Sequence, residues 1–199
     1  MNVVALFLKV PALGKVKTRL AKTMGDEGAL MAYADLVKFL LNRLEGSRIH
    51  IHHTSPDPSP MVEWLGEKYV YSLQDGLGLG ERLPHAMELE FAEGADKLIF
   101  IGGDCPFIDQ ARIESAFAAL DDCEVVIGPA TDGGYYLIGL KALHSGLFED
   151  VAWGTKAVFK RTLKICRKLG LSCSTLPEES DVDDFESWER AKAFMDRSS

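Results

Sequence analysis

The feature that most constrains the fold is a regular alternation of short apolar runs with longer amphipathic segments. The clearest run is KLIFIGG (Lys97 to Gly103), in which apolar residues fill both alternating sets of side chains. A strand of this kind is buried on both faces, as in a parallel sheet covered by helices. The alternation predicts a three-layer α/β/α sandwich with a mostly parallel, Rossmann-like mixed sheet.

The same patterns predict the individual elements. Strands are expected at 3–8, 49–53, 69–73, 97–103, 124–130, 135–140 and 172–176, and helices near 28–44, 61–66, 81–91, 110–120, 155–169 and 184–195. No helix separates 124–130 from 135–140, so at least one of the two is expected to run antiparallel or to connect through an inserted loop. With no repeat or linker, residues 1–199 are expected to form a single domain.

Composition limits the classes of function. The chain has 199 residues and a net charge of -8, which argues against a nucleic-acid or anionic-membrane surface. No apolar run approaches about 18 residues, so no membrane span is expected. The four cysteines form no CxxC pair, which argues against a zinc site and favours a reducing, cytoplasmic location.

Positive charge is concentrated near the N-terminus, in LKVPALGKVKTRLA. The first 22 residues contain five lysines and arginines and none of the 30 acidic residues. Pro11 and Gly14 predict a loop after the first strand, from which Lys15, Lys17 and Arg19 project. Backbone N–H groups and these cations could hold a di- or triphosphate. The alternative is a solvated basic loop.

The central strand is followed by GGDCPFID. Gly102 and Gly103 allow a ligand to approach the backbone closely. Asp109 fits the N-cap of the next helix, which leaves Asp104 without a structural role. A carboxylate at a strand end can hold Mg²⁺ or Mn²⁺, so Asp104 is a candidate metal ligand.

Two later segments carry further candidates. In GPATDGGYYLIGL, Asp132 stands in a turn with Gly133 and could contact an acceptor or act as a base; alternatively the turn is purely structural. Tyr135 and Tyr136 alternate, so only one is expected to face a cleft. In ESDVDDFESW, one of Asp181, Asp183 and Asp184 is expected to cap the last helix, and another could be a second metal ligand.

Two weaker patterns are discounted. GLGLG after the third strand does not complete a G-x-G-x-x-G dinucleotide motif, because Glu81 occupies the last glycine position. His50 and His52 share one face of a strand, but no carboxylate partner is evident. A polar strand end is therefore the preferred interpretation of the IHIHH segment.

Taken together, these motifs resemble the GT-A superfamily of nucleotide-diphospho-sugar transferases, in particular small bacterial glycosyltransferases associated with arsenosugar biosynthesis. The matching segments are LKVPALGKVKTRLA, LQDGLGLGERL, GGDCP, GPATDGGYYLIGL, VAWGTKAV and DVDDFESW. The resemblance implies a nucleotide-diphospho-sugar transferase fold and a nucleotide across the first loop. Its phosphates would be bound by Lys9, Gly14, Lys17, Arg19 and Gly103.

The resemblance also implies roles for later residues. Asp104 and Asp183 would be the metal ligands, by analogy with a DxDTPEDL-like segment of related nucleotidyltransferases. The sugar or acceptor side would be formed by Arg82, Asp132, Gly133 and Tyr135. Catalysis would depend on Asp104, Lys17 and Asp132.

One departure keeps the reaction open. Glycosyltransferases of this superfamily carry D-x-D, whereas Asp104 is followed by Cys105 and Pro106. This D-x-P form, like the KTRL segment, resembles small nucleotidyltransferases such as the 2-phospholactate and molybdopterin guanylyltransferases.

Three hypotheses follow. The leading one is metal-dependent glycosyl transfer from a nucleotide-diphospho-sugar to a small-molecule acceptor. The alternative is nucleotidyl transfer from a nucleoside triphosphate with release of pyrophosphate. The third is a non-enzymatic nucleotide-binding protein. The sequence indicates neither the base, the sugar, the acceptor nor an oligomeric interface.

Overall fold

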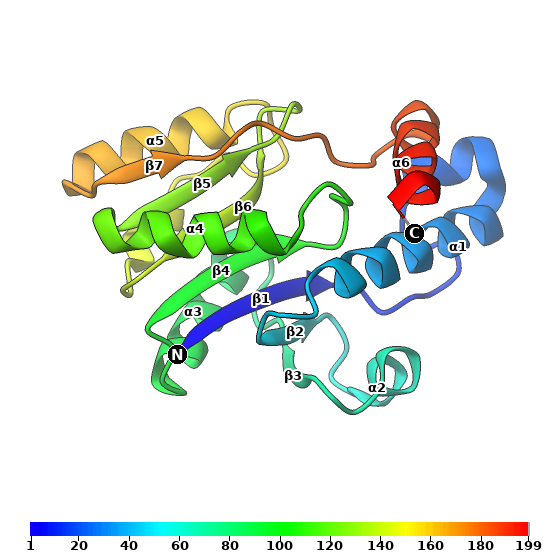
Figure 1. Cartoon of the computed structure of the whole chain (residues 1–199), viewed down its shortest axis with the longest axis horizontal. Helices are drawn as coiled ribbons and strands as arrows, with labels where there is room; N and C mark the ends of the chain where they lie inside the picture. Colours follow the sequence, from blue (N-terminus) through cyan, green and yellow to red (C-terminus); the bar gives the residue numbers. More distant parts are fainter. Residues whose placement is uncertain (199) are drawn as a thin grey trace.

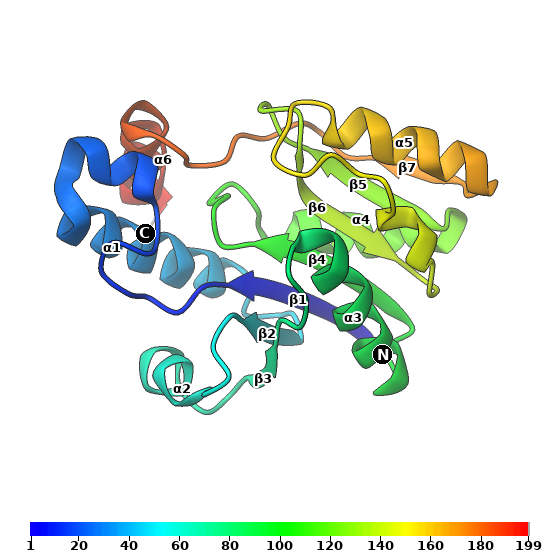
Figure 2. The same ribbon diagram turned by 180° about the vertical axis from the view of Figure 1, so that it is seen from behind.

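The computed structural model describes residues 1–198 and shows a mixed seven-stranded sheet between layers of helices (Figures 1 and 2). The strands are β1 (Asn2–Leu8), β2 (Ile49–His53), β3 (Val70–Leu73), β4 (Lys97–Gly102), β5 (Val125–Pro129), β6 (Tyr135–Leu140) and β7 (Cys173–Thr175). The helices are α1 (Thr18–Arg43), α2 (Ser59–Leu65), α3 (Leu79–Ala92), α4 (Gln110–Asp122), the 3₁₀ turn η1 (Ser145–Phe148), α5 (Val158–Leu169) and α6 (Phe185–Ser198). The predicted α/β fold is confirmed.

The sheet has the order β3-β2-β1-β4-β6-β5-β7. β6 pairs antiparallel with β4 and β5, while the other pairs are parallel. The expectation of one antiparallel strand around the Asp132 turn is thus confirmed. Because β6 runs in reverse, its first residue lies at the same edge of the sheet as the carboxyl ends of β1 and β4.

Alternating side chains of the strands supply two cores, one on each face. Val4, Leu6 and Leu8 of β1 pack with α1, α2 and α4, whereas Val3 and Ala5 pack with α3 and α5. Strands buried on both faces read as continuous apolar runs, which is why KLIFIGG was recognisable. The three layers are visible in Figure 1.

The N-terminal half of α1 differs from the prediction. The helix begins at Thr18 rather than near residue 28, so Arg19 belongs to the first helical turn and not to a loop. Gly25, at φ 74° and ψ 169°, interrupts the helix. The apolar periodicity therefore does not continue across Gly25, and residues 18–24 were not predicted to be helical. Leu20, fully buried, anchors this first part against α6.

The segment from Leu176 to Asp184, here called the strap, connects β7 to α6 across the carboxyl edge of the sheet (Figure 1). Arg112 of α4 holds it: the guanidinium donates to Glu179 Oε1 at 2.9 Å and to the carbonyl of Pro177 at 3.2 Å. At its far end, Val182 packs with Trp188 of α6 against α1. The strap therefore brings its aspartates to the strand ends.

None of the helices in the described part of the chain is both long and apolar enough to cross a membrane.

Candidate active site

Residues from the two ends of the chain meet at the carboxyl edge of the sheet. β1 and β4 are parallel neighbours, with Phe7 opposite Gly102, so the segments that follow them leave the sheet side by side. In a doubly wound sheet this edge is where ligands bind. Lys9 and Asp104 stand at the two strand ends.

Lys17 joins three remote segments. Its ammonium lies 2.7 Å from Asp104 Oδ1 and donates to the carbonyl of Val182 in the strap. The Val182 N–H in turn donates to the carbonyl of Asp104 at 2.9 Å. The side chain of Lys17 is only 5% exposed, whereas that of Asp104 is 48% exposed. Lys17 is thus held in place, and Asp104 remains open to a ligand.

The backbone of Lys17 is itself unusual. It adopts φ 48° and ψ 43°, the left-handed region that non-glycine residues rarely occupy. Strain of this kind costs roughly 1–3 kcal/mol and persists where the surrounding structure enforces it, often at functional sites. Lys17 is the N-cap of α1, and the first residues of that helix, Thr18 and Arg19, line one pocket with Asp104. A helix N-terminus beside a lysine is a favourable place for phosphate.

The three aspartates at the end of the strap, Asp181, Asp183 and Asp184, take different positions. Asp184 caps α6 by accepting from the Ser187 N–H at 2.9 Å, so the prediction that one of them is a cap is confirmed. Asp183 Oδ2 lies 3.3 Å from Arg19 Nη1, at the rim of the pocket that also contains Lys9, Lys17 and Asp104. Of the predicted phosphate and metal residues, this pocket brings together Lys9, Lys17, Arg19, Asp104 and Asp183, whereas Gly14 and Gly103 are not among its lining residues.

Asp181 is a site residue that the sequence did not single out from its neighbours. Burial, then the carboxylates of Asp104 and Asp132, raise its pKa to about 7, against the opposing effect of Lys17. In the sequence, Asp181 is distinguished only by its position two residues before Asp183, with the buried Val182 between them. The strap had to be placed in space before its role could be seen.

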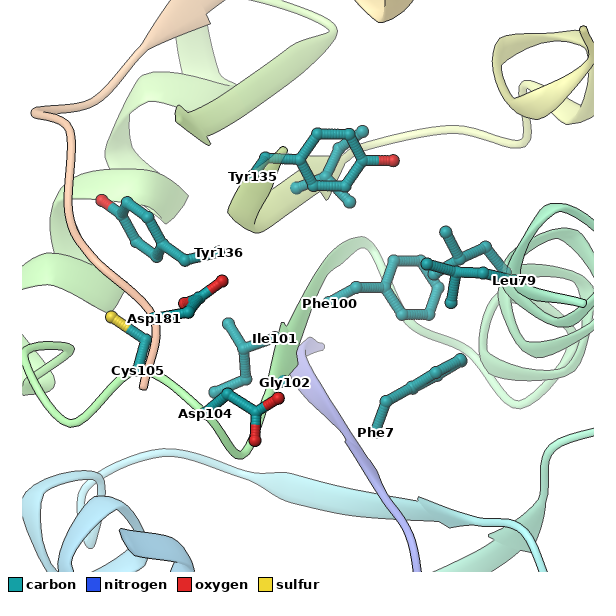
Figure 3. Close-up of a pocket in the computed structure, with 12 residues that line it drawn as sticks. Phe7, Leu79, Phe100, Ile101, Gly102, Asp104, Cys105, Tyr135, Tyr136 and Asp181 are labelled. Carbon is teal, nitrogen blue, oxygen red and sulfur yellow. The ribbon is translucent and has the colours of Figure 1, made fainter. Parts of the chain in front are cut away.

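Two cavities open on either side of Asp104. The first, here called the cationic cleft, has Lys9, Lys17 and Arg82 in its wall, with Gln74 and Gly103 beside them. The second, the apolar cavity, has a volume of about 210 Å³ and is shown in Figure 3. It is lined by Phe7, Leu79, Leu83, Phe100, Ile101, Gly102, Asp104, Cys105, Tyr135, Tyr136, Ile138 and Asp181.

Several residues that were predicted to bind the phosphates or the sugar make structural contacts. Gly14 turns the loop before α1 at φ 69°. Gly103 lines the cationic cleft, and a Cβ there would come within 2.6 Å of Leu8 Cδ2. Arg82 donates to the Gly76 carbonyl at 2.9 Å and faces the cationic cleft rather than the cavity with Tyr135. Burial raises the pKa of the Cys105 thiol far above its usual range, so this cysteine is held as the neutral thiol.

The turn before β6 has a structural role, and neither Asp132 nor Gly133 is among the lining residues of the two cavities. Asp132 Oδ1 accepts from the Gly134 N–H at 2.7 Å, and Gly133, at φ 91°, allows the backbone of Lys156 to approach. The expectation that only one tyrosine faces a cleft is wrong, since both Tyr135 and Tyr136 line the apolar cavity. They flank it from the two faces of the sheet because β6 starts at the open edge.

The donor set suits a hard divalent cation. Asp104 and Asp183 line one small pocket together with Lys9, Lys17 and Arg19, so two carboxylates face the same space. Asp181 lies in the wall of the apolar cavity on the side of Asp104. Oxygen ligands of this kind are those that Mg²⁺ and Mn²⁺ prefer. The residues present therefore fit the predicted metal.

The IHIHH segment is a correction to the sequence analysis. His50 and His52 are buried rather than at a polar strand end, and Glu90 of α3 is the carboxylate partner that the sequence did not reveal. Its oxygens lie 2.8 Å from His50 Nδ1 and 2.7 Å from His52 Nε2. His50 and Glu90, with Glu93, also form the one group of three potential metal ligands within 4.8 Å among the described residues. Glu90 belongs to α3 and Glu93 is the C-cap of that helix. Glu90 is 40 residues from His50 and 38 from His52 along the chain, so spacing could not predict the contact.

Comparison with proteins of known structure supports this picture. The chain superposes on a protein from Desulfovibrio desulfuricans G20, provisionally assigned as a nucleotide-diphospho-sugar transferase, with a TM-score of 0.88 and 30% identity, over 98% of this chain and 97% of the other. A cytidylyltransferase from Leptospira borgpetersenii shares the fold, with a TM-score of 0.62 and 13% identity over 98% and 87% of the two chains.

A curated relative is the phosphoenolpyruvate guanylyltransferase of Sphaerobacter thermophilus. It is 27% identical over 122 residues, which are 60% of this chain and 59% of the relative. The chain thus spans less than two thirds of the length of that enzyme.

The Desulfovibrio protein and the Sphaerobacter enzyme are both described as transferases. The predictions of a nucleotide-diphospho-sugar transferase-like superfamily and of a transferase are therefore confirmed, whereas the type of group transferred is not determined. Residues 39–155 match the family described as an uncharacterized protein conserved in bacteria, DUF2064. The match covers more than half of the sequence and includes β4, Asp104 and the Asp132 turn. The chain therefore belongs to the DUF2064 family of bacterial proteins.

Proposed function

We propose that this protein is a glycosyltransferase that uses a nucleotide-diphospho-sugar as donor. The observation that carries the proposal is the convergence of Lys17, Asp104 and the strap on one point between two cavities. The donor phosphates would lie in the cationic cleft, and the transferred group would extend past Asp104 towards the apolar cavity. The likeness to the nucleotide-diphospho-sugar transferase over nearly the whole chain favours this donor class.

The roles of the residues follow from their positions. Lys17, with Arg19 at the first turn of α1, would stabilise the charge that develops on the departing diphosphate. Mg²⁺ or Mn²⁺ held by Asp104 and Asp183 would supply further neutralisation of that charge. Lys9 and the N–H groups at the start of α1 would orient the phosphates, and Asp132 would stand on the acceptor side.

In the proposed reaction, an acceptor oxygen bonds to the anomeric carbon of the sugar. The bond from that carbon to the phosphate oxygen breaks, and nucleoside diphosphate leaves with the electron pair. The acceptor hydroxyl would pass its proton to the carboxylate of Asp132, the candidate base on the acceptor side. The second candidate is nucleotidyl transfer, in which an acceptor oxygen attacks the α-phosphorus and pyrophosphate leaves. The guanylyltransferase relative and the cytidylyltransferase fold favour that candidate.

A donor panel tests the choice. The protein is incubated with Mg²⁺, small acceptors and each common nucleotide-sugar or nucleoside triphosphate, and released nucleoside diphosphate and pyrophosphate are measured separately. Nucleoside diphosphate from a nucleotide-sugar is expected. Pyrophosphate released only from a plain triphosphate contradicts glycosyl transfer.

The nucleotide site is tested by Lys17→Ala. Loss of a charge-assisted hydrogen bond of about 1.5–3 kcal/mol predicts nucleotide binding weaker by roughly 10- to 100-fold. Lys22→Ala is the matched control, since Lys22 is exposed on the same helix. Equal affinities of the two variants in a titration calorimeter would show that phosphates do not bind at Lys17.

A further inference from the structure

The apolar cavity differs in chemistry from the cationic cleft beside it. One wall consists of apolar side chains, with Phe7 and Phe100 in edge contact at 5.5 Å between ring centroids. Figure 3 shows this wall opposite the carboxylates of Asp104 and Asp181. The two cavities share Asp104, so a molecule in one would meet a nucleotide bound in the other.

No lysine, arginine or histidine is among the residues that line this cavity in the described part of the chain. The nearby cations are engaged elsewhere. Lys17 binds Asp104 and the Val182 carbonyl. Arg112 lies behind Tyr136, where it donates to the tyrosine hydroxyl at 2.8 Å and pairs with Glu179.

The carboxylates of Asp104 and Asp181 are both in the wall of the cavity, with no cationic side chain among the lining residues of the described chain. An anionic group placed here would lose its hydration without gaining a cationic partner. A divalent ion held by Asp104 would have its positive charge neutralised by the phosphates of the donor, so it would not provide a cationic partner for an anion in the cavity.

The same wall suits a neutral ligand that carries hydroxyl groups. Carboxylates accept hydrogen bonds from hydroxyls, and those to a charged acceptor are the stronger kind. Phe7, Phe100 and Leu79 offer an apolar surface on the other side of the cavity. An apolar pocket with a few converging polar groups is the usual form of a small-molecule site.

We propose that the apolar cavity binds the acceptor, and that this acceptor is an uncharged, hydroxyl-bearing molecule with an apolar face. It carries neither a phosphate nor a carboxylate. This inference rests on the proposed function, because it assigns the acceptor to the same site. It sets the protein apart from transferases whose acceptor is a phosphate or a carboxylic acid.

A matched pair of probes tests the inference. Phenyl β-glucoside is neutral and presents hydroxyls, whereas phenyl phosphate carries the same ring with an anion. Each is titrated calorimetrically into the protein saturated with Mg²⁺ and nucleoside diphosphate, so that the cationic cleft is filled. The glucoside is expected to bind at least tenfold more tightly.

A pair of variants locates the binding. Leu79 lies between the two cavities, in the wall of both, and is 41% exposed, whereas Leu77, in the loop just before it, is 93% exposed and in neither lining. Because nucleoside diphosphate fills the cationic cleft in this titration, a lysine at position 79 acts on a probe in the apolar cavity. Leu79→Lys is expected to tighten phenyl phosphate binding at least fivefold, and Leu77→Lys to leave it unchanged.

The proposal is overturned if phenyl phosphate binds as tightly as the glucoside, if neither probe binds, or if the two lysine variants behave alike. These outcomes are separate from a failure of the proposed function. That failure would appear as nucleotide binding unaffected by Lys17→Ala, or as release of pyrophosphate alone in the donor panel.

Discussion

At the scale of single residues, the site depends on side chains whose surroundings fix their charge and direction. Lys17 is the clearest case, with a left-handed backbone, a nearly buried ammonium and contacts to Asp104 and Val182. Its place in KTRL was predictable from the sequence. Its strained backbone and its carbonyl partner were not, because both depend on the strap 165 residues away.

Glu90 gives a prediction at the same scale. Burial alone would raise its pKa, but the hydrogen bonds from His50 and His52 outweigh burial and lower it to about 2. A carboxyl with a depressed pKa in the folded state stabilises the protein above its unfolded pKa and loses this effect as the pH falls. Glu90→Gln is therefore expected to lower the free energy of unfolding at pH 7, with the gap from the parent narrowing from pH 4.5 downwards.

Urea unfolding of both proteins at several pH values between 7 and 3 measures this gap. Glu88→Gln is the control, because Glu88 is exposed on the same helix and outside the cluster of His50, Glu90 and Glu93. A gap that stays constant over the whole range would mean that Glu90 is not held as a carboxylate by the two histidines.

At the scale of elements, the strap decides which aspartates reach the site. Arg112→Ala removes the side chain that ties Glu179 and Pro177 to α4. We expect faster hydrogen exchange at the N–H groups of Glu179 and Val182, and nucleotide binding weaker by about tenfold, since a looser strap holds Lys17 less well.

Arg190→Ala is the matched control, because Arg190 pairs only along α6 with Glu186 in the contacts described. Unchanged exchange at Val182 in Arg112→Ala would show that α4 does not hold the strap. Exchange that rises equally in both variants would point to α6 instead.

The elements also show what a sequence can predict. Strands buried on both faces, such as β4, and the turn into β6 were readable because they carry continuous apolar runs and Asp-Gly-Gly chemistry. The start of α1 was missed because Gly25 breaks its periodicity. Asp181 was not singled out because the extended strap has no periodic sequence pattern. The roles of Arg112 and Glu90 were not predicted because the residues that they contact are remote in the sequence.

At the scale of the molecule, two apolar clusters cover the faces of the sheet and a third joins α1 to α6 and the strap. We propose that they unfold together as a single domain, as expected from the absence of linkers. The three tryptophans report on one cluster each, Trp64 beside α1, Trp153 near α3 and Trp188 in α6. Variants that keep one tryptophan are expected to give denaturation midpoints that coincide with one another and with far-UV circular dichroism. An earlier transition at Trp188 alone would mean that α6 and the strap form a separate unit.

The whole molecule also places a positive site within a chain of net charge -8. Lys9, Lys17 and Asp104 line both the cationic cleft and the small pocket that contains Arg19 and Asp183. This arrangement of cations and carboxylates suits one small polyanion with a divalent ion. A crystal structure with Mn²⁺ and a nucleoside diphosphate is the most direct test. The account predicts the diphosphate against Lys17 and Arg19, with the anomalous peak of the metal at the Asp104 carboxylate. A diphosphate bound away from Lys17, or manganese found only at other residues such as His50 and Glu90, would contradict it.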